Sequence, residues 1–225
     1  MNIRIHLPFA SRVLHPQRSW ICLAFFLAAT LAHAQTGWKS ETTRDGKVQV
    51  LSRITIAKAA DGTETPIVEY NASTTAKAEF QHCLTVLRDV SKHKLIHDDH
   101  SSETIKVLAE NERIVHYGLK VVWPLPKIDC VARMVVLVDS VARTATITLT
   151  GAPDQLAPRA ERRLSQYQQT YTLKDLGGGS VELRSAGRSA PPFAVPKWML
   201  KAAFPAAAAD PLLKIVELSR ETGSR

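Results

Sequence analysis

Alternation of apolar and polar residues, with many β-branched side chains, predicts that most of this chain forms β-strands. Short connections, such as Asn111-Glu112 and the glycine-containing segment Lys174–Gly179, indicate antiparallel hairpins. The pattern predicts strands over Lys47–Ile56, Ile67–Thr75, Thr104–Glu110, Arg113–Trp123, Cys130–Asp139, Thr144–Thr150, Arg163–Leu173 and Ser180–Ala186.

Two segments have a helical pattern instead. Ala76–Val90 carries apolar residues at a period near 3.6, which predicts an amphipathic helix. Pro196–Ser219 is alanine-rich and predicts a long C-terminal helix that Pro205 and Pro211 kink or restart. The polar segment Ser91–Glu103 is predicted to be a loop. Strands bracketed by helices indicate an α+β fold with an antiparallel sheet.

The N-terminus has the features of a secretory signal peptide. Three arginines and no acidic residue precede the uncharged apolar run Trp20–Leu31, and Ala32-His33-Ala34 has small residues at the positions that a signal peptidase reads. The run is shorter than the about 20 residues of a membrane-spanning helix. We expect residues 1–34 to be removed, so that Gln35–Arg225 forms one domain, periplasmic or secreted. An uncleaved membrane anchor is the alternative.

Charge excludes one class of partner. The net charge is +8, and the excess is spread along the chain without a basic stripe interleaved with aromatic residues, so nucleic acid is not an expected partner. The densest basic cluster, Arg159, Arg162 and Arg163, is interpreted as a solvated face. Transient attraction to an anionic membrane surface stays open.

Cysteines and histidines give no sign of a metal or cofactor. Cys83 and Cys130 remain after cleavage, and they form either a disulfide or two separate buried thiols. Lys92–His100 holds three histidines and two aspartates, but no H-E-x-x-H pattern and no second cluster that completes a ligand set. We therefore interpret it as a solvated loop and expect no metal and no cofactor.

The segment Trp123–Asp129 reads WPLPKID, and its two prolines cannot continue a strand, so it predicts a corner between strands. This segment resembles the W-P-L-S-x-R-D corner of the START family of lipid-transfer domains. Gly37-Trp38, the segment Leu87–Asp89 with His93, and Val195–Trp198 resemble further family motifs in the same order.

Three positions depart from the family pattern. Ile128 replaces the arginine that precedes the aspartate, although Asp129 is kept. Ile96 stands where the family often has tryptophan, and Gly187 comes too early to fill the glycine position before the last helix. The resemblance therefore implies a divergent member whose ligand cannot be carried over from the family.

The resemblance implies a helix-grip fold, in which a curved antiparallel sheet wraps a long C-terminal helix and encloses an apolar cavity. Period-2 alternation puts Met134 and Val136 on one face of their strand and Arg133 on the other, and the family suggests a charged residue inside the cavity near Arg133. The ligand-binding candidates are Trp123, His116, Arg133, Met134, Val136, Met199, Ala203 and Ala206.

These features favour non-covalent binding, and possible transport, of a lipid or other hydrophobic small molecule. The chain has no G-x-S-x-G nucleophile elbow and no glycine-rich phosphate loop, because Gly177–Gly179 lies between two strands. We therefore expect no enzyme. The alternative is a cyclase- or hydrolase-type enzyme of the same fold, for which His116 is the only candidate catalytic residue.

Overall fold

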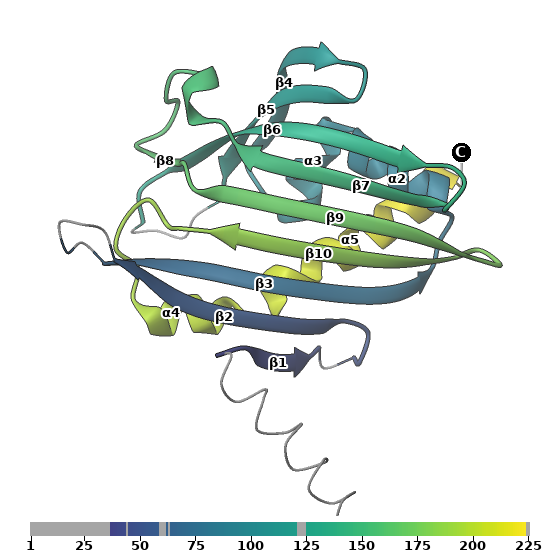
Figure 1. Cartoon of the computed structure of the whole chain (residues 1–225), viewed down its shortest axis with the longest axis horizontal. Coiled ribbons are helices and arrows are strands. Elements are labelled where there is room, and N and C mark those ends of the chain that lie inside the picture. The colour runs from purple at the N-terminus through teal and green to yellow at the C-terminus, as the bar shows by residue number, and fades with distance from the viewer. Residues whose placement is uncertain (1–36, 44, 59–61, 63, 121–124, 224–225) are drawn as a thin grey trace, which may run out of the picture. The chain divides into compact units, whose positions relative to one another are not determined.

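A computed structural model describes residues 37–43, 45–58, 62, 64–120 and 125–223. The unit Lys39–Arg225 contains a ten-stranded sheet in the order β1-β2-β3-β10-β9-β7-β6-β5-β4, with β8 paired to β6 (Figure 1). All pairings are antiparallel except β6 with β8. The strands are β1 Lys39–Thr42, β2 Gln49–Lys58, β3 Glu64–Lys77, β4 Ser101–Ala109, β5 Glu112–Leu119, β6 Ile128–Asp139, β7 Thr144–Gly151, β8 Arg162–Leu164, β9 Tyr167–Gly177 and β10 Ser180–Ser189.

Helices cover one face of this sheet (Figure 1). They are α2 Phe80–Arg88, α3 Val90–His97, α4 Lys197–Ala203 and α5 Ala206–Gly223, with a short 3-10 turn η1 at Pro153–Gln155. The sheet curves over α5, which packs against β3, α2 and α3. The predicted α+β class, with a curved antiparallel sheet and a long C-terminal helix, is confirmed.

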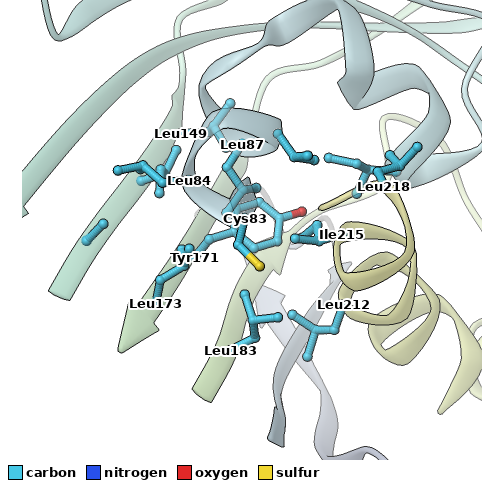
Figure 2. Packing of buried hydrophobic residues seen from close by; sticks show 14 of the residues in the cluster. Cys83, Leu84, Leu87, Leu149, Tyr171, Leu173, Leu183, Leu212, Ile215 and Leu218 are labelled. Atoms are coloured by element: carbon cyan, nitrogen blue, oxygen red, sulfur yellow. The ribbon is translucent and has the colours of Figure 1, made fainter. Parts of the chain in front are cut away.

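The core lies between α5, α2 and the inner face of the sheet. Figure 2 shows Cys83 and Leu87 of α2 facing Leu212 and Ile215 of α5, with Tyr171 of β9 between them. Each of these side chains is at most 1% exposed. Interior side chains packed in this way exclude water and account for much of the stabilisation of the fold.

The two prolines of the C-terminal segment have different positions relative to its helices. Pro205 separates α4 from α5, whereas Pro211 is buried inside α5 without ending it. Among the described residues, no helix combines the length and apolar character needed to cross a bilayer.

Two sequence predictions are wrong. The segment predicted as the loop Ser91–Glu103 forms α3 and the start of β4, because His93 and Ile96 are buried under the sheet rather than exposed. The strand predicted over Arg163–Leu173 is two strands, since β8 ends at Leu164 and pairs with β6 before β9 begins. The hairpin across Asn111-Glu112 is confirmed.

Two further predictions concern the corner and the thiols. The corner residues Trp123 and Pro124 lie outside the described residues, between β5 and β6. Cys83 and Cys130 are both free and buried, so the structure has separate thiols rather than a disulfide.

Candidate ligand cavity

A cavity of about 260 Å³ lies at one end of the strands, on the inner face of the sheet. Antiparallel pairing brings the end of β5, the start of β6, the start of β9 and the end of β10 to this end of the sheet. Helix α3 adds its last turn, and no described lining residue comes from α5. Leu149 and Leu164 supply apolar surface, and three tyrosines supply rings with polar ends.

Tyr117 is held in this cavity by a buried histidine. The Tyr117 hydroxyl lies 2.8 Å from His93 Nδ1, and His93 Nε2 lies 2.9 Å from the carbonyl oxygen of Leu87. Burial lowers the pKa of His93, so the ring is neutral. The histidine thereby satisfies two polar groups that would otherwise be costly to bury.

Tyr70 is held by a second chain of hydrogen bonds. Its hydroxyl donates to Gln169 Oε1 at 2.6 Å, and Gln169 Nε2 donates to Ser185 Oγ at 2.7 Å. The Tyr70 ring packs against the backbone of Gly187, and its other neighbour is the Phe204 ring, 5.9 Å away between centroids. These contacts fix Tyr70 as part of the cavity wall.

His97 and Asp99 bring titratable groups to the same cavity. His97 Nε2 lies 2.8 Å from the Tyr171 hydroxyl, and burial lowers the His97 pKa to about 4. Asp98 ends α3 with a φ of 55°, a left-handed conformation that aspartate tolerates, and Asp99 follows at the cavity. Burial raises the Asp99 pKa to about 6 although the Lys120 N–H donates to Oδ1 at 3.1 Å.

The predicted cavity residues of β5 and β6 divide between the two faces of the sheet. Met134 and Val136 are buried on the inner face, as the alternation predicts, but they lie in the core and not among the cavity-lining residues. Arg133 is on the opposite, exposed face, where Nε lies 2.7 Å from Glu112 Oε1. The expectation of a charged Arg133 inside the cavity is therefore wrong, because strand alternation turns it away.

His116 is also on the outer face, next to Tyr117 in sequence but opposite to it in direction. It is buried, and its Nε2 lies 3.4 Å from Asp129 Oδ2. Its Nδ1 lies 3.3 Å from Glu103 Oε1 but forms no hydrogen bond with good geometry. His116 is thus part of a charged cluster outside the cavity and not a cavity residue.

Asp129 is the centre of this outer cluster. Arg163 Nη2 lies 2.5 Å from Asp129 Oδ2, and Arg163 Nε lies 2.9 Å from Oδ1. The side chains of Asp129 and Arg163 are 1% and 10% exposed. The interpretation of Arg163 as part of a solvated basic face is wrong; Arg163 pairs with Asp129, whose neighbour Ile128 replaces the arginine of the family pattern.

The remaining candidates lie toward the C-terminus or outside the described residues. Met199 is half-buried, and Ala203 and Ala206 are exposed. None of them lines the cavity. Trp123 lies outside the described residues.

Sequence reasoning missed the residues that form the polar lining. Tyr117 shares its strand face with buried Val115, and His93 and His97 are four residues apart on one side of α3. These two spacings are the signals that could have found them. Tyr70, Gln169 and Asp99 have no comparable local signal, because their proximity arises from strand pairing.

Other sites are less suited to a ligand. Hollows of about 370 and 400 Å³ lie beside residues 190–194 and against β3, β9 and β10, and neither is lined by a buried titratable side chain in the described part of the chain. Within that part, no group of three or more His, Cys, Asp and Glu side chains is arranged to hold a metal ion.

Comparisons with known proteins identify the fold. No protein-family model matches the chain, and no curated protein matches it in sequence. A STAR-related lipid transfer protein from Xanthomonas axonopodis superposes with a TM-score of 0.68, covering 82% of this chain and 99% of that chain at 19% identity. The human StarD13 lipid transfer and protein localization domain gives 0.65, covering 87% and 95% at 18% identity.

A third solved structure, the Zhui aromatase/cyclase from a Streptomyces species, gives a TM-score of 0.50, covering 71% of this chain and 96% of that chain at 13% identity. The chain therefore has the START-like helix-grip fold.

Proposed function

We propose that this protein binds a small hydrophobic molecule non-covalently in the 260 Å³ cavity and carries it through an aqueous compartment. The observation that supports this most is a cavity lined by leucines, tyrosine rings and polar groups fixed by hydrogen bonds, within a fold shared with proteins named for lipid transfer. Apolar surface combined with placed polar groups is typical of small-molecule sites.

The size of the cavity limits what it holds. Its volume is slightly below the roughly 300–1,000 Å³ of drug-sized ligand sites, so it suits a compact ligand or one end of a longer one. The driving force is burial of the ligand's apolar surface, worth roughly 25 cal/mol per Å² removed from water.

Export and membrane contact belong to the same proposal. Residues 1–34 have the features of a signal peptide, so the aqueous compartment is the periplasm or the exterior. Trp198 on α4 is 69% exposed and Lys201 lies one turn further on; an exposed tryptophan beside a cation suits brief contact with an anionic membrane surface. Sedimentation with phosphatidylserine vesicles is expected to fall in Trp198→Ala and to be unchanged in Leu137→Ala, an exposed control on β6.

The test is native mass spectrometry of protein expressed as the full chain and purified from the periplasm, followed by organic extraction. We expect the mass of Gln35–Arg225 with a stoichiometric adduct that extracts as one class of hydrophobic compound. A bare mass that stays unchanged after incubation with membrane lipid extract would overturn the proposal.

A pair of variants ties the adduct to the cavity. Leu164→Trp adds bulk at the cavity wall and is expected to reduce the adduct. Leu176→Trp makes the same change at an exposed position on β9 and is expected to retain it. Circular dichroism of both variants checks that the loss is not caused by unfolding.

A cyclase-type enzyme is the second candidate, and one observation favours it. Asp99 lines the cavity with a pKa raised to about 6 by burial, which suits a general acid or base near neutral pH. Incubating the protein with its extracted ligand distinguishes the two functions, since a carrier returns the compound with its mass unchanged. If the mass changes, loss of turnover in Asp99→Asn with binding retained would assign catalysis to this carboxyl group.

A further inference from the structure

The direction of the Tyr117 hydrogen bond follows from the partner of His93. A carbonyl oxygen only accepts hydrogen bonds, so His93 Nε2, 2.9 Å from the Leu87 oxygen, carries the ring hydrogen. In the neutral ring Nδ1 is then an acceptor, and Tyr117 donates its hydroxyl hydrogen to it across 2.8 Å. Toward the cavity, Tyr117 therefore offers only the lone pairs of its oxygen.

The hydroxyl hydrogen of Tyr70 is also used within the protein. Its hydroxyl hydrogen is used in the 2.6 Å bond to Gln169 Oε1, so it is not available to a ligand. The Tyr167 side chain has no hydrogen bond within the described residues, so its hydroxyl can either donate to a ligand or accept from one. Tyr167 therefore does not decide which kind of polar group the cavity favours.

Asp99 adds a second acceptor beside Tyr117. Its Oδ1 accepts the Lys120 N–H at 3.1 Å, and its Oδ2 has no hydrogen-bond partner in the described part of the chain. An ionised carboxylate has no hydrogen to donate. Tyr117 and Asp99 both line the cavity. Burial raises the pKa of Tyr117, and the nearby Asp99 charge raises it further.

The cations that line the cavity do not reverse this polarity. Lys120 Nζ lies 2.5 Å from Asp98 Oδ2, and Arg188 Nε lies 3.8 Å from Glu69 Oε1. Both basic side chains are more than half exposed, so they lie at the solvent side with acidic partners. A phosphate or carboxylate would therefore meet acceptor oxygens deeper in the cavity.

We propose that the ligand presents a hydrogen-bond donor, a hydroxyl or an ammonium group, to Asp99 Oδ2 and the Tyr117 hydroxyl oxygen. This inference rests on the proposed function and deepens it by naming the polar group of the ligand. An anionic head group, or a molecule without any O–H or N–H, is disfavoured because it would displace water from these acceptor oxygens without giving them a hydrogen in return.

The protonation state of Asp99 distinguishes a ligand with an ammonium group from one with a hydroxyl group. The titratable groups that interact with it or line the same cavity are His97, Asp98, Tyr117, Lys120, Cys130, Tyr167, Tyr171 and Arg188. Because the Asp99 pKa is about 6, the carboxyl group is ionised at pH 7.5 and protonated at pH 5. An ammonium ligand loses its counter-charge at pH 5, whereas a neutral hydroxyl ligand keeps an oxygen to which it can donate.

The experiment uses four probes with one naphthalene skeleton, measured by calorimetry and probe fluorescence at pH 7.5 and pH 5. 2-Naphthol is a neutral donor, 2-naphthylmethylammonium a cationic donor, 2-methoxynaphthalene lacks a donor, and 2-naphthoate is an anion. At pH 7.5 we expect at least one donor probe to bind about tenfold more tightly, or better, than 2-methoxynaphthalene and 2-naphthoate. One hydrogen bond to a charged group is enough for such a difference. If only the ammonium probe loses affinity at pH 5, the interaction is an ion pair between the ligand's ammonium group and the ionised Asp99.

The variants use a matched pair of neighbouring acids. Asp99→Asn removes the cavity charge and is expected to weaken the ammonium probe about tenfold or more. Asp98→Asn makes the same charge change on a side chain that is 83% exposed and outside the cavity lining, and is expected to leave both donor probes unchanged.

The outcomes separate this inference from the function on which it rests. Equal binding of 2-naphthol and 2-methoxynaphthalene, or tighter binding of 2-naphthoate, overturns the donor inference and leaves the carrier function standing. If no probe binds but the purified protein carries an adduct, an extracted compound without O–H or N–H overturns it, and one with such a group supports it. If no probe binds and the purified protein carries no adduct, both the donor inference and the carrier function are overturned.

Discussion

The ring of Tyr70 packs directly against the backbone of Gly187. The two residues are partners across β3 and β10, and a methyl group at position 187 would lie 2.5 Å from Tyr70 Cζ and 2.8 Å from Gln169 Oε1. Glycine is required here for this close approach and not for an unusual φ angle. The cavity wall therefore depends on the absence of one side chain.

Gly187→Ala is expected to displace Tyr70 and destabilise the protein by about 1–3 kcal/mol, as overpacking of an interior does. The displaced ring would also lose its hydrogen bond to Gln169. Urea unfolding measures the first effect, and binding of the extracted ligand measures the second.

A double-mutant cycle controls for other effects of the methyl group. In a Tyr70→Ala background the ring is gone, so Gly187→Ala is expected to cost much less than in the wild type. An equal cost in the two backgrounds would mean that Tyr70 is not the obstacle.

Arg163→Met is expected to destabilise the fold by about 3–5 kcal/mol, because it leaves the Asp129 carboxylate buried without its main partner. Burial by itself would raise the pKa of Asp129, but hydrogen bonds from Arg163 and the Arg159 N–H outweigh it and lower this pKa. A lowered folded-state pKa means that the pair stabilises the fold above the unfolded pKa and loses this effect as the pH falls through the folded one.

Chemical denaturation at pH 7 measures the cost of Arg163→Met. Arg162→Met is the control, since its side chain is exposed beside Arg163, and it is expected to change stability by less than about 0.5 kcal/mol. Similar small losses in both variants would contradict the assignment of Arg163 as the buried partner.

Asp99 and His97 are expected to have opposite effects on how the stability of the fold changes with pH. Burial raises the Asp99 pKa from 3.8 to about 6, so the folded chain holds the extra proton between these values and the Asp99 contribution falls as the pH rises. Burial lowers the His97 pKa from 6.5 to about 4, so the unfolded chain holds the extra proton and the His97 contribution rises with pH.

Asp99→Asn removes the Asp99 contribution to this pH dependence and leaves that of His97. The variant is expected to lose about 2–3 kcal/mol more stability than the wild type on acidification from pH 7 to pH 4, as measured by urea unfolding at each pH. His97→Gln is expected to show the reverse, a smaller loss than the wild type. Parallel pH curves for the wild type and Asp99→Asn would rule out a buried, proton-binding Asp99.

The thiols of Cys83 and Cys130 are expected to be present but unreactive in the folded protein. Burial raises the pKa of Cys83, and it raises that of Cys130 to about 12, which suppresses the thiolate that reacts. In denaturant without reductant, Ellman's reagent is expected to detect the thiols of Cys83 and Cys130. In native buffer it is expected to detect little of either. Failure to detect thiols in denaturant would indicate a disulfide.

Local patterns predicted the hairpins because each depends on residues that are adjacent in sequence. The strand over Cys130–Asp139 and its partner over Thr144–Thr150 lie within one residue or two of β6 and β7. The family resemblance added the wrapping of the sheet over α5, which no periodicity specifies. It did not place the cavity residues.

Helix α3 shows why the site escaped prediction. Its sequence is rich in lysine and histidine, and such a composition normally indicates an exposed segment. His93 is buried and His97 half-buried, and Tyr117 and Tyr171 each pair with one of their ring nitrogens. These tyrosines are 24 and 74 residues away along the chain. A polar residue whose partner comes from a distant strand cannot be recognised as buried from its own neighbourhood.

The packed contact between α5 and the sheet has a consequence for ligand traffic. The cavity lies at the ends of the strands, and none of its described lining residues belongs to α5. Entry and departure of a ligand therefore need not separate the helix from Leu183 and Tyr171, the contacts that hold the domain together (Figure 2). Under the proposed carrier function, amide hydrogens of α5 should exchange only at the rate of global unfolding, even while the ligand binds and leaves many times.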